Sequence, residues 1–150
     1  MTLAGLVLIV LAILVGALVP IQAGINATLA HHGGHPLFAM AANMSLATVT
    51  VFAGILALRV PMPVGNVLAA APWYAWLGGL CGAALVFSAI VLAPKLGAVA
   101  FVSASIVGTV GASLIVDHFG LLAFRPTPVT GLRLMGGALV VLGMVLVNKG

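Results

Sequence analysis

The sequence contains very little charge. Five of its 150 residues are lysine or arginine and one is acidic, so that 4% are charged, whereas soluble domains carry roughly 25%. A soluble domain must cover most of its surface with groups that water accepts, which excludes a water-soluble enzyme and a disordered tail. The basic residues are scattered singly along the chain, which also excludes a nucleic-acid-binding surface.

Cysteine is almost absent as well. The single Cys81 excludes an internal disulfide and a multi-cysteine metal site, and we expect its thiol to lie in an apolar helix as a small hydrophobe. His31, His32 and His35 are close in sequence, but no carboxylate or thiol is near them and residues 33–34 are both glycine. A hydrated loop at the membrane surface is therefore favoured over a metal site, and we expect no cofactor.

What the chain has in abundance is apolar sequence. Hydrophobic residues make up 64% of it, and 19 further residues are glycine. A helix that crosses a hydrocarbon core of ~30 Å needs about 20 apolar residues, so that the length allows six or seven spans at most. We predict an integral membrane protein whose residues 1–150 form a single transmembrane domain. No basic segment precedes the first apolar run, which argues against a cleaved signal peptide.

Glycine, proline and charged residues divide this sequence into apolar runs. Pro20 should kink the first run, and residues 94–97 predict a tight connection between the third and fourth, where Pro94 is a second candidate hinge. Residues 59–72 form the longest polar connection. The prediction is an all-α fold with five transmembrane helices, over residues 3–30, 37–58, 73–93, 98–118 and 131–148. An odd number of spans places the two termini on opposite sides of the membrane.

The basic residues leave the orientation of these helices open. Five spans put Arg59, Arg125 and Arg133 on one side of the membrane and Lys95 and Lys149 on the other. The positive-inside rule needs a clear excess of lysine and arginine on one side, and three against two is hardly an excess. One interpretation is that the three arginines still hold their side in the cytoplasm. The other is dual topology, in which the chain inserts both ways.

The predicted fourth span carries polar residues at every fourth position: Ser105, Thr109, Ser113 and Asp117. This spacing places them on one stripe of the helix, where they could line a water-accessible path. The alternative is that the hydroxyls bond to their own helix and serve only packing. Asp117, the only acid, lies in the last turn beside His118, so that we interpret both as interfacial residues. Asp117 could pair there with Arg125 or with Arg133.

Amide side chains mark the first two spans. Gln22 and Asn26 lie four residues apart just after Pro20, and Asn43 and Thr50 share a face of the second span. Amides offer donors and acceptors to a polar ligand, and they also form hydrogen bonds between membrane helices; both interpretations stay open. An amide lining suits a neutral, zwitterionic or anionic ligand better than a cation. The candidate cavity-lining residues are Gln22, Asn26, Asn43, Ser105, Thr109 and Ser113.

Several short motifs occur in a characteristic order. They are Pro20-x-Gln22-x-Gly24-Ile25-Asn26-x-x-Leu29-Ala30, Gly34-x-Pro36-Leu37, Leu92-Ala93-Pro94-Lys95-Leu96-Gly97-Ala98 and Asp117-His118-Phe119-Gly120. Over nearly its whole length the chain resembles the five-helix YdcZ-type branch of the drug/metabolite transporter superfamily, which are bacterial inner-membrane proteins. Relatives tend to carry glutamine after the glycine of the fourth span, where this chain has Thr109.

The resemblance implies an assembly and a function. Larger members of the superfamily have ten helices in two inverted halves, so that a five-helix chain is one half and should pair with an inverted copy of itself or with an inverted paralogue. We expect a transporter of a small polar or amphipathic metabolite, an antiparallel homodimer in the lipid bilayer, and not an enzyme or a nucleic-acid-binding protein. The alternative is a non-transporting membrane subunit or a lipid-interacting scaffold.

Overall fold

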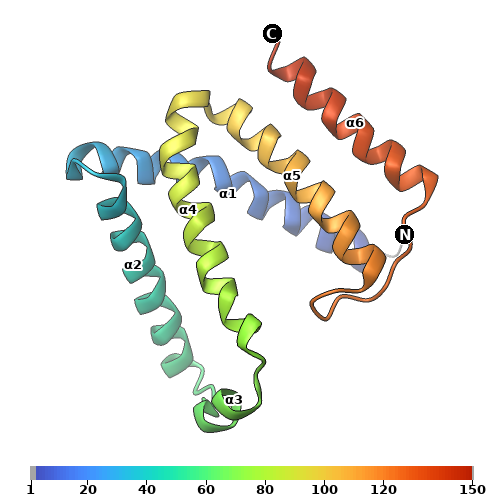
Figure 1. Ribbon diagram of the computed structural model, residues 1–150. Helices are drawn as coiled ribbons and strands as arrows, with labels where there is room; N and C mark the ends of the chain where they lie inside the picture. The colour runs from blue at the N-terminus through green and yellow to red at the C-terminus, as the bar shows by residue number, and fades with distance from the viewer. Residues whose placement is uncertain (1–2, 150) are drawn as a thin grey trace. The chain divides into compact units, whose positions relative to one another are not determined.

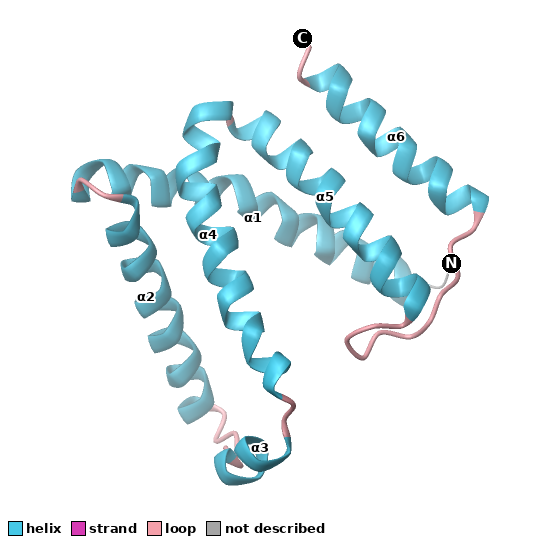
Figure 2. Cartoon of the chain, viewed as in Figure 1, coloured by secondary structure: helices cyan, strands magenta, loops and turns pink. Residues whose placement is uncertain are grey.

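Only helices and loops occur in the part of the chain that the computed structural model describes, residues 3–149 (Figures 1 and 2). The all-α prediction is confirmed; residues 1, 2 and 150 of the predicted domain lie outside the described range. The elements are α1 (Leu3–Gly33), α2 (Pro36–Ala57), α3 (Val64–Ala70), a 3₁₀ helix (Trp73–Trp76), α4 (Leu77–Leu96), α5 (Ala98–Phe119) and α6 (Gly131–Val147).

Four segments are long and apolar enough to cross a membrane: α1, α2, the segment from Trp73 to the end of α4, and α5. The fifth apolar helix, α6, is shorter, with 17 residues. Nearly all large apolar side chains of these helices are exposed on the chain. Apolar exposure on this scale is untenable in water and favourable in lipid. The chain is therefore a polytopic membrane protein.

The helix ends follow local chemistry. His35 accepts a hydrogen bond on Nδ1 from the backbone N–H of Leu37 at 3.1 Å, and Pro36 occupies the first turn of α2, where its missing N–H costs nothing. Thr130 caps α6 in the same way, because its Oγ1 accepts from the backbone N–H of Arg133 at 3.3 Å. These caps place the starts of α2 and α6 within one residue of the predicted positions 37 and 131.

The structure differs from the predicted helices at three places. The first helix continues through His31 and His32 to Gly33, because the turn needs only Gly34, which adopts a positive φ of 74°, and the cap residue after it. Similarly, α4 passes through Pro94 and ends at Leu96, so that only Gly97, with φ 86°, separates it from α5. A proline deprives just one carbonyl of its partner, so that the helix continues for two residues beyond Pro94.

The third difference lies in the connection predicted as polar over residues 59–72. Its second half forms the short helix α3, which is followed by the 3₁₀ helix ahead of α4. Pro63 stands directly before α3 as its cap residue, and Pro72 stands before the 3₁₀ helix. Proline fixes a φ that helix starts require, so that each proline starts a helical turn as well as ending the preceding segment.

The chain divides into two compact units, residues 1–20 with 95–150 and residues 21–94. The divisions fall directly after Pro20 in α1 and directly after Pro94 in α4. These are the two prolines predicted as hinges, a role that stays a prediction. Within the first unit α5 and α6 pack together, and a side-chain carbon at Gly137 would come within 3.5 Å of Leu114 Cδ1. An added methyl group at Gly137 would therefore make ordinary van der Waals contact with α5.

The second unit contains every buried residue of the described part of the chain. Four of them are apolar, Ala23, Ala39, Ile90 and Ala93, and one is polar, Asn26. They come from the end of α1, from α2 and from α4. The best-shielded part of this protein therefore includes an amide side chain, which is costly to bury unless it forms hydrogen bonds.

Candidate functional site

An amide pair links α1 to α2 in the second unit. Asn43 donates from Nδ2 to Asn26 Oδ1 at 3.1 Å. Asn26 is only 4% exposed, and Asn43 is half-buried. Asn26 lies seven residues before the end of α1 and Asn43 seven residues after the start of α2. Equal spacing from one tight turn places the two amides about two helical turns from it, at the same height.

The structure thus brings together two of the predicted cavity-lining residues from different helices. Gln22, on the same helix as Asn26, is exposed, and so is Thr50. The Thr50 hydroxyl donates to the Leu46 carbonyl of its own helix at 2.8 Å. Pairing between Asn26 and Asn43 is the interhelical hydrogen bond that the sequence left open as one interpretation. It does not exclude ligand binding, because one hydrogen bond satisfies only part of each amide.

The predicted stripe on α5 is present and exposed at Ser105, Thr109 and Ser113. Ser105 Oγ donates to the Phe101 carbonyl and Thr109 Oγ1 donates to the Ser105 carbonyl, each at 2.8 Å. The hydroxyl protons of these two residues are therefore used within the helix. The oxygen lone pairs of Ser105 and Thr109 remain free to accept hydrogen bonds. Whether the stripe lines a path stays a prediction.

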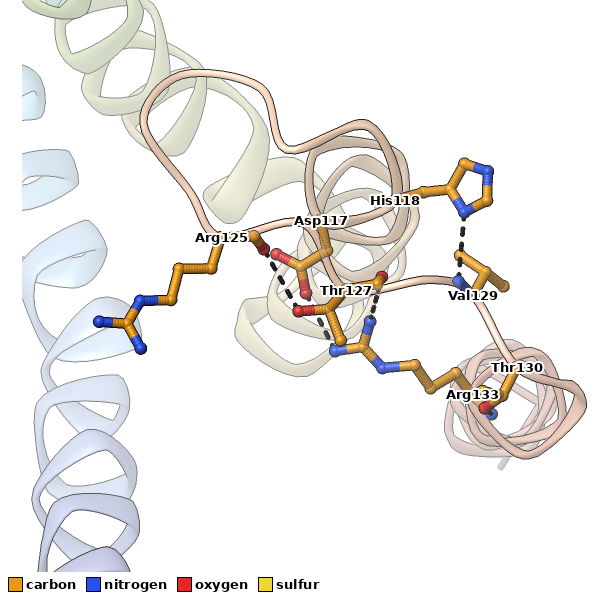
Figure 3. A network of polar contacts seen from close by, with 7 residues as sticks. All are labelled: Asp117, His118, Arg125, Thr127, Val129, Thr130 and Arg133. Atoms are coloured by element: carbon orange, nitrogen blue, oxygen red, sulfur yellow. Dashed lines mark hydrogen bonds and ion pairs between the residues drawn. The ribbon is translucent and has the colours of Figure 1, made fainter.

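A second polar cluster joins the end of α5 to the start of α6 in the first unit (Figure 3). Asp117 Oδ2 lies 3.0 Å from Nη2 of Arg133, whose Nη1 donates to the Thr127 carbonyl at 3.2 Å. The backbone N–H of Thr127 donates to the Asp117 carbonyl at 2.7 Å. His118 Nδ1 accepts from the backbone N–H of Val129 at 3.2 Å. The loop is therefore bound to the helix on both sides of residue 128.

The Asp117 pairing predicted from sequence is confirmed, with Arg133 as the partner. The Arg125 side chain extends away from the cluster in Figure 3. With side-chain exposures of 29% for Asp117 and 36% for Arg133, the pair is partly hydrated and stabilises the fold modestly. The Asp117 carboxylate forms an ion pair with the Arg133 guanidinium. The geometry indicates a clasp that holds the α5–α6 connection.

We predict that replacing Asp117 by Asn lowers the free energy of unfolding by about 1 kcal/mol or less, because a partly exposed ion pair contributes little. Thermal unfolding of the purified protein in detergent measures this change. Arg125→Gln is the matched control and should leave the unfolding temperature unchanged, because its guanidinium lies outside the cluster. A loss of several kcal/mol in Asp117→Asn would contradict the view of Asp117 as a hydrated clasp residue.

The three histidines around the turn between α1 and α2 are exposed. His31 and His32 lie at the exposed end of α1, and His35 uses Nδ1 to cap α2. Among residues 3–149, no group of three or more histidine, cysteine, aspartate or glutamate side chains is placed to hold a metal ion. Cys81 is exposed on α4, the apolar helix in which its thiol was expected.

One polar contact was missed by sequence reasoning. Asn148 Nδ2 donates to Ser103 Oγ at 3.1 Å and to the Met144 carbonyl at 2.7 Å, which ties the end of α6 to α5. An apolar pocket of about 300 Å³ lies beside it, lined by Pro20, Val102, Ser103 and Val147 among others. The only sequence signal for this contact is the amide that ends the last apolar run, directly before Lys149.

Comparison with known proteins identifies the family of this helical protein. Residues 7–146 match the family described as "Putative inner membrane exporter, YdcZ". The chain belongs to this family. The suspected YdcZ-type identity is thereby confirmed, and the chain is a multi-pass membrane transporter of a family described as inner-membrane exporters. Exporter membership also supports the expectation that the protein is not an enzyme. No curated protein and no solved structure gives a match.

Proposed function

We propose that this YdcZ-family chain transports a small polar or amphipathic metabolite by alternating access, as an antiparallel homodimer of dual topology. All five apolar helices, α6 included, then span the membrane as one transmembrane domain. Each chain supplies one half of a ten-helix, inverted-repeat transporter, and the bilayer, the second copy and the unidentified solute are its partners. A pairing with an inverted paralogue is the alternative assembly.

The observation that carries the proposal is how little of the chain is buried. The described residues include only five buried ones, and the largest apolar side chains are exposed along every membrane-length helix. Lipid covers an apolar helix face, but it does not shield polar groups such as the α5 stripe, because hydrocarbon offers no hydrogen bonds. A second copy supplies protein surface against which such polar groups are enclosed and a solute path is formed.

The charge distribution supports the inverted arrangement of the two copies. Arg59, Arg125 and Arg133 lie on one predicted side and Lys95 and Lys149 on the other. The positive-inside rule counts lysine and arginine, and a difference of three against two gives it little on which to act.

Alternating access requires parts of the chain that move relative to a rest that stays rigid. The division of the chain directly after Pro20 and Pro94 supports such motion, because proline removes one backbone hydrogen bond from the helix at that point. A helix weakened at a single position bends there at lower cost than elsewhere. We propose that both prolines act as hinges of the transport cycle.

Reporter fusions to the C-terminus test the orientation. One fusion carries a reporter that is active only in the cytoplasm, and the other carries a reporter that is active only in the periplasm. We expect both fusions to be active, each at a substantial fraction of its own single-orientation standard. Activity of only one fusion would contradict dual topology and leave the inverted paralogue as the partner. Transport itself is tested with the purified protein in liposomes. Absence of flux for every compound in a broad metabolite panel would favour the non-transporting scaffold.

A further inference from the structure

The amide pair of Asn26 and Asn43 has unused hydrogen-bonding groups. Each amide carries two N–H donors and one carbonyl acceptor. The single bond from Asn43 Nδ2 to Asn26 Oδ1 leaves the Nδ2 group of Asn26 and the Oδ1 atom of Asn43 without a partner among residues 3–149. Whichever amide accepts, the pair offers one free donor group and one free acceptor.

These free groups are not fully buried. Asn26 is 4% exposed as a residue, yet no fully buried side-chain nitrogen or oxygen of the described residues lacks a partner. Because Asn26 Nδ2 has no partner, some of its surface is accessible. An amide donor that is largely shielded from water but still accessible forms stronger hydrogen bonds with a solute than an exposed one.

The surroundings of the pair disfavour a charged ligand. The unit that contains it, residues 21–94, has no aspartate or glutamate, and Arg59 is its only lysine or arginine. The one acid of the chain, Asp117, belongs to the other unit and is paired with Arg133. A cation next to Asn26 would lose hydration without gaining a counter-charge, and burying an uncompensated charge is costly.

We propose that the amide pair of Asn26 and Asn43 recognises a neutral solute through a group that both donates and accepts hydrogen bonds, a carboxamide being the best match. The Nδ2 group of Asn26 donates to the carbonyl of the solute, and Oδ1 of Asn43 accepts from its N–H. This inference rests on the proposed transport function and names the class of its substrate. A cation is rejected for lack of a counter-charge, and an anion because its charge would face the free Oδ1 acceptor of Asn43.

Equilibrium binding of three radiolabelled probes to the purified protein in detergent tests the assignment. Acetamide, acetate and methylammonium are similar in size and differ in charge. We expect selective binding of acetamide, and a decrease of about tenfold in its affinity in Asn26→Leu and in Asn43→Leu, because each variant removes one hydrogen bond to the solute. The control Asn66→Leu alters an exposed amide of α3 in the same unit and should bind as the wild type does.

A charge variant keeps the test decisive if the leucine variants misfold. In Asn43→Asp, the Asn26 amide turns over and donates to the new carboxylate, so that the link between α1 and α2 persists. The pair then presents two acceptors and a negative charge. We expect the preference to change from acetamide to methylammonium. Unchanged selectivity in this variant, or a wild type that binds no acetamide or prefers a charged probe, would overturn the assignment.

Failure of this inference is distinguishable from failure of the proposed function. Wild-type protein in liposomes is assayed in parallel for flux of a broad metabolite panel. Selective binding of acetamide without any flux would refute transport and leave recognition by the pair in place. Flux that persists unchanged in Asn26→Leu, together with unselective binding, would refute the role of the pair and leave transport in place.

Discussion

Two variants with opposite charge bias should each fail to dimerise alone and should form dimers when they are produced together. Arg59→Gln with Arg125→Gln leaves one basic residue on that side against the two lysines on the other. Lys95→Gln with Lys149→Gln leaves three against none. Because lysine and arginine set orientation, each variant should insert in one direction only, so that an inverted partner exists only in the mixture.

Co-purification of two affinity tags measures this effect without knowledge of the substrate. Each variant is produced with both tags, alone and in combination with the other variant. We expect dimer recovery of at most about one tenth of the wild-type level from either variant alone, and near wild-type recovery from the mixture. Arg133 is retained in both because it forms the clasp with Asp117. Full recovery from one variant alone would mean that the dimer is parallel.

The second large effect concerns Gly120, which ends α5 in the left-handed conformation at φ 60°. A side-chain carbon added here would meet Pro126 Cγ at 2.6 Å. Gly120→Ala therefore combines the cost of left-handed backbone, about 1–2 kcal/mol, with a steric clash against a rigid ring, about 1–3 kcal/mol. We expect the free energy of unfolding to fall by ~2–5 kcal/mol in denaturant titrations of the purified protein.

Gly34 provides the matched control for this experiment. It has a similarly positive φ, 74°, but no atom lies within 4 Å of an added carbon. Gly34→Ala should therefore lose only the backbone contribution, about 1–2 kcal/mol. The difference between the two variants isolates the contact with Pro126 and thus the close packing of the loop on α5. Equal losses in both would show that the loop does not pack there in the membrane protein.

Much of the fold could be predicted from the sequence, because glycine and proline divide apolar runs of membrane length. The boundaries of α2, α5 and α6 lie within one residue of their predicted positions. Errors arose where proline was interpreted only as a helix breaker. Pro94 lies inside α4, since a helix tolerates proline one turn from its end. Pro63 precedes the start of α3, in a segment that has too few residues for a detectable period.

The candidate site was less predictable. Helical periodicity relates residues of one helix, and it grouped Gln22 with Asn26 correctly as neighbours on α1. The partner of Asn26 depends on how α1 and α2 are joined. The length of the turn at Gly34 determines which residue of α2 lies opposite Asn26, and that residue is Asn43. For Asp117 the loop left two arginines within reach. The cap at Thr130 fixes the start of α6, and the third residue of that helix is the one that pairs.

The helices of this chain differ greatly in length, and each length can be compared with the thickness of the bilayer. With 17 residues, α6 extends about 25 Å and is shorter than a hydrocarbon core of ~30 Å. With 31 residues, α1 extends about 46 Å and exceeds it. In the five-span arrangement α1 must tilt, while the bilayer must thin around an upright α6. If all five helices span the membrane, we therefore expect transport by this protein to depend on the acyl-chain length of the lipid.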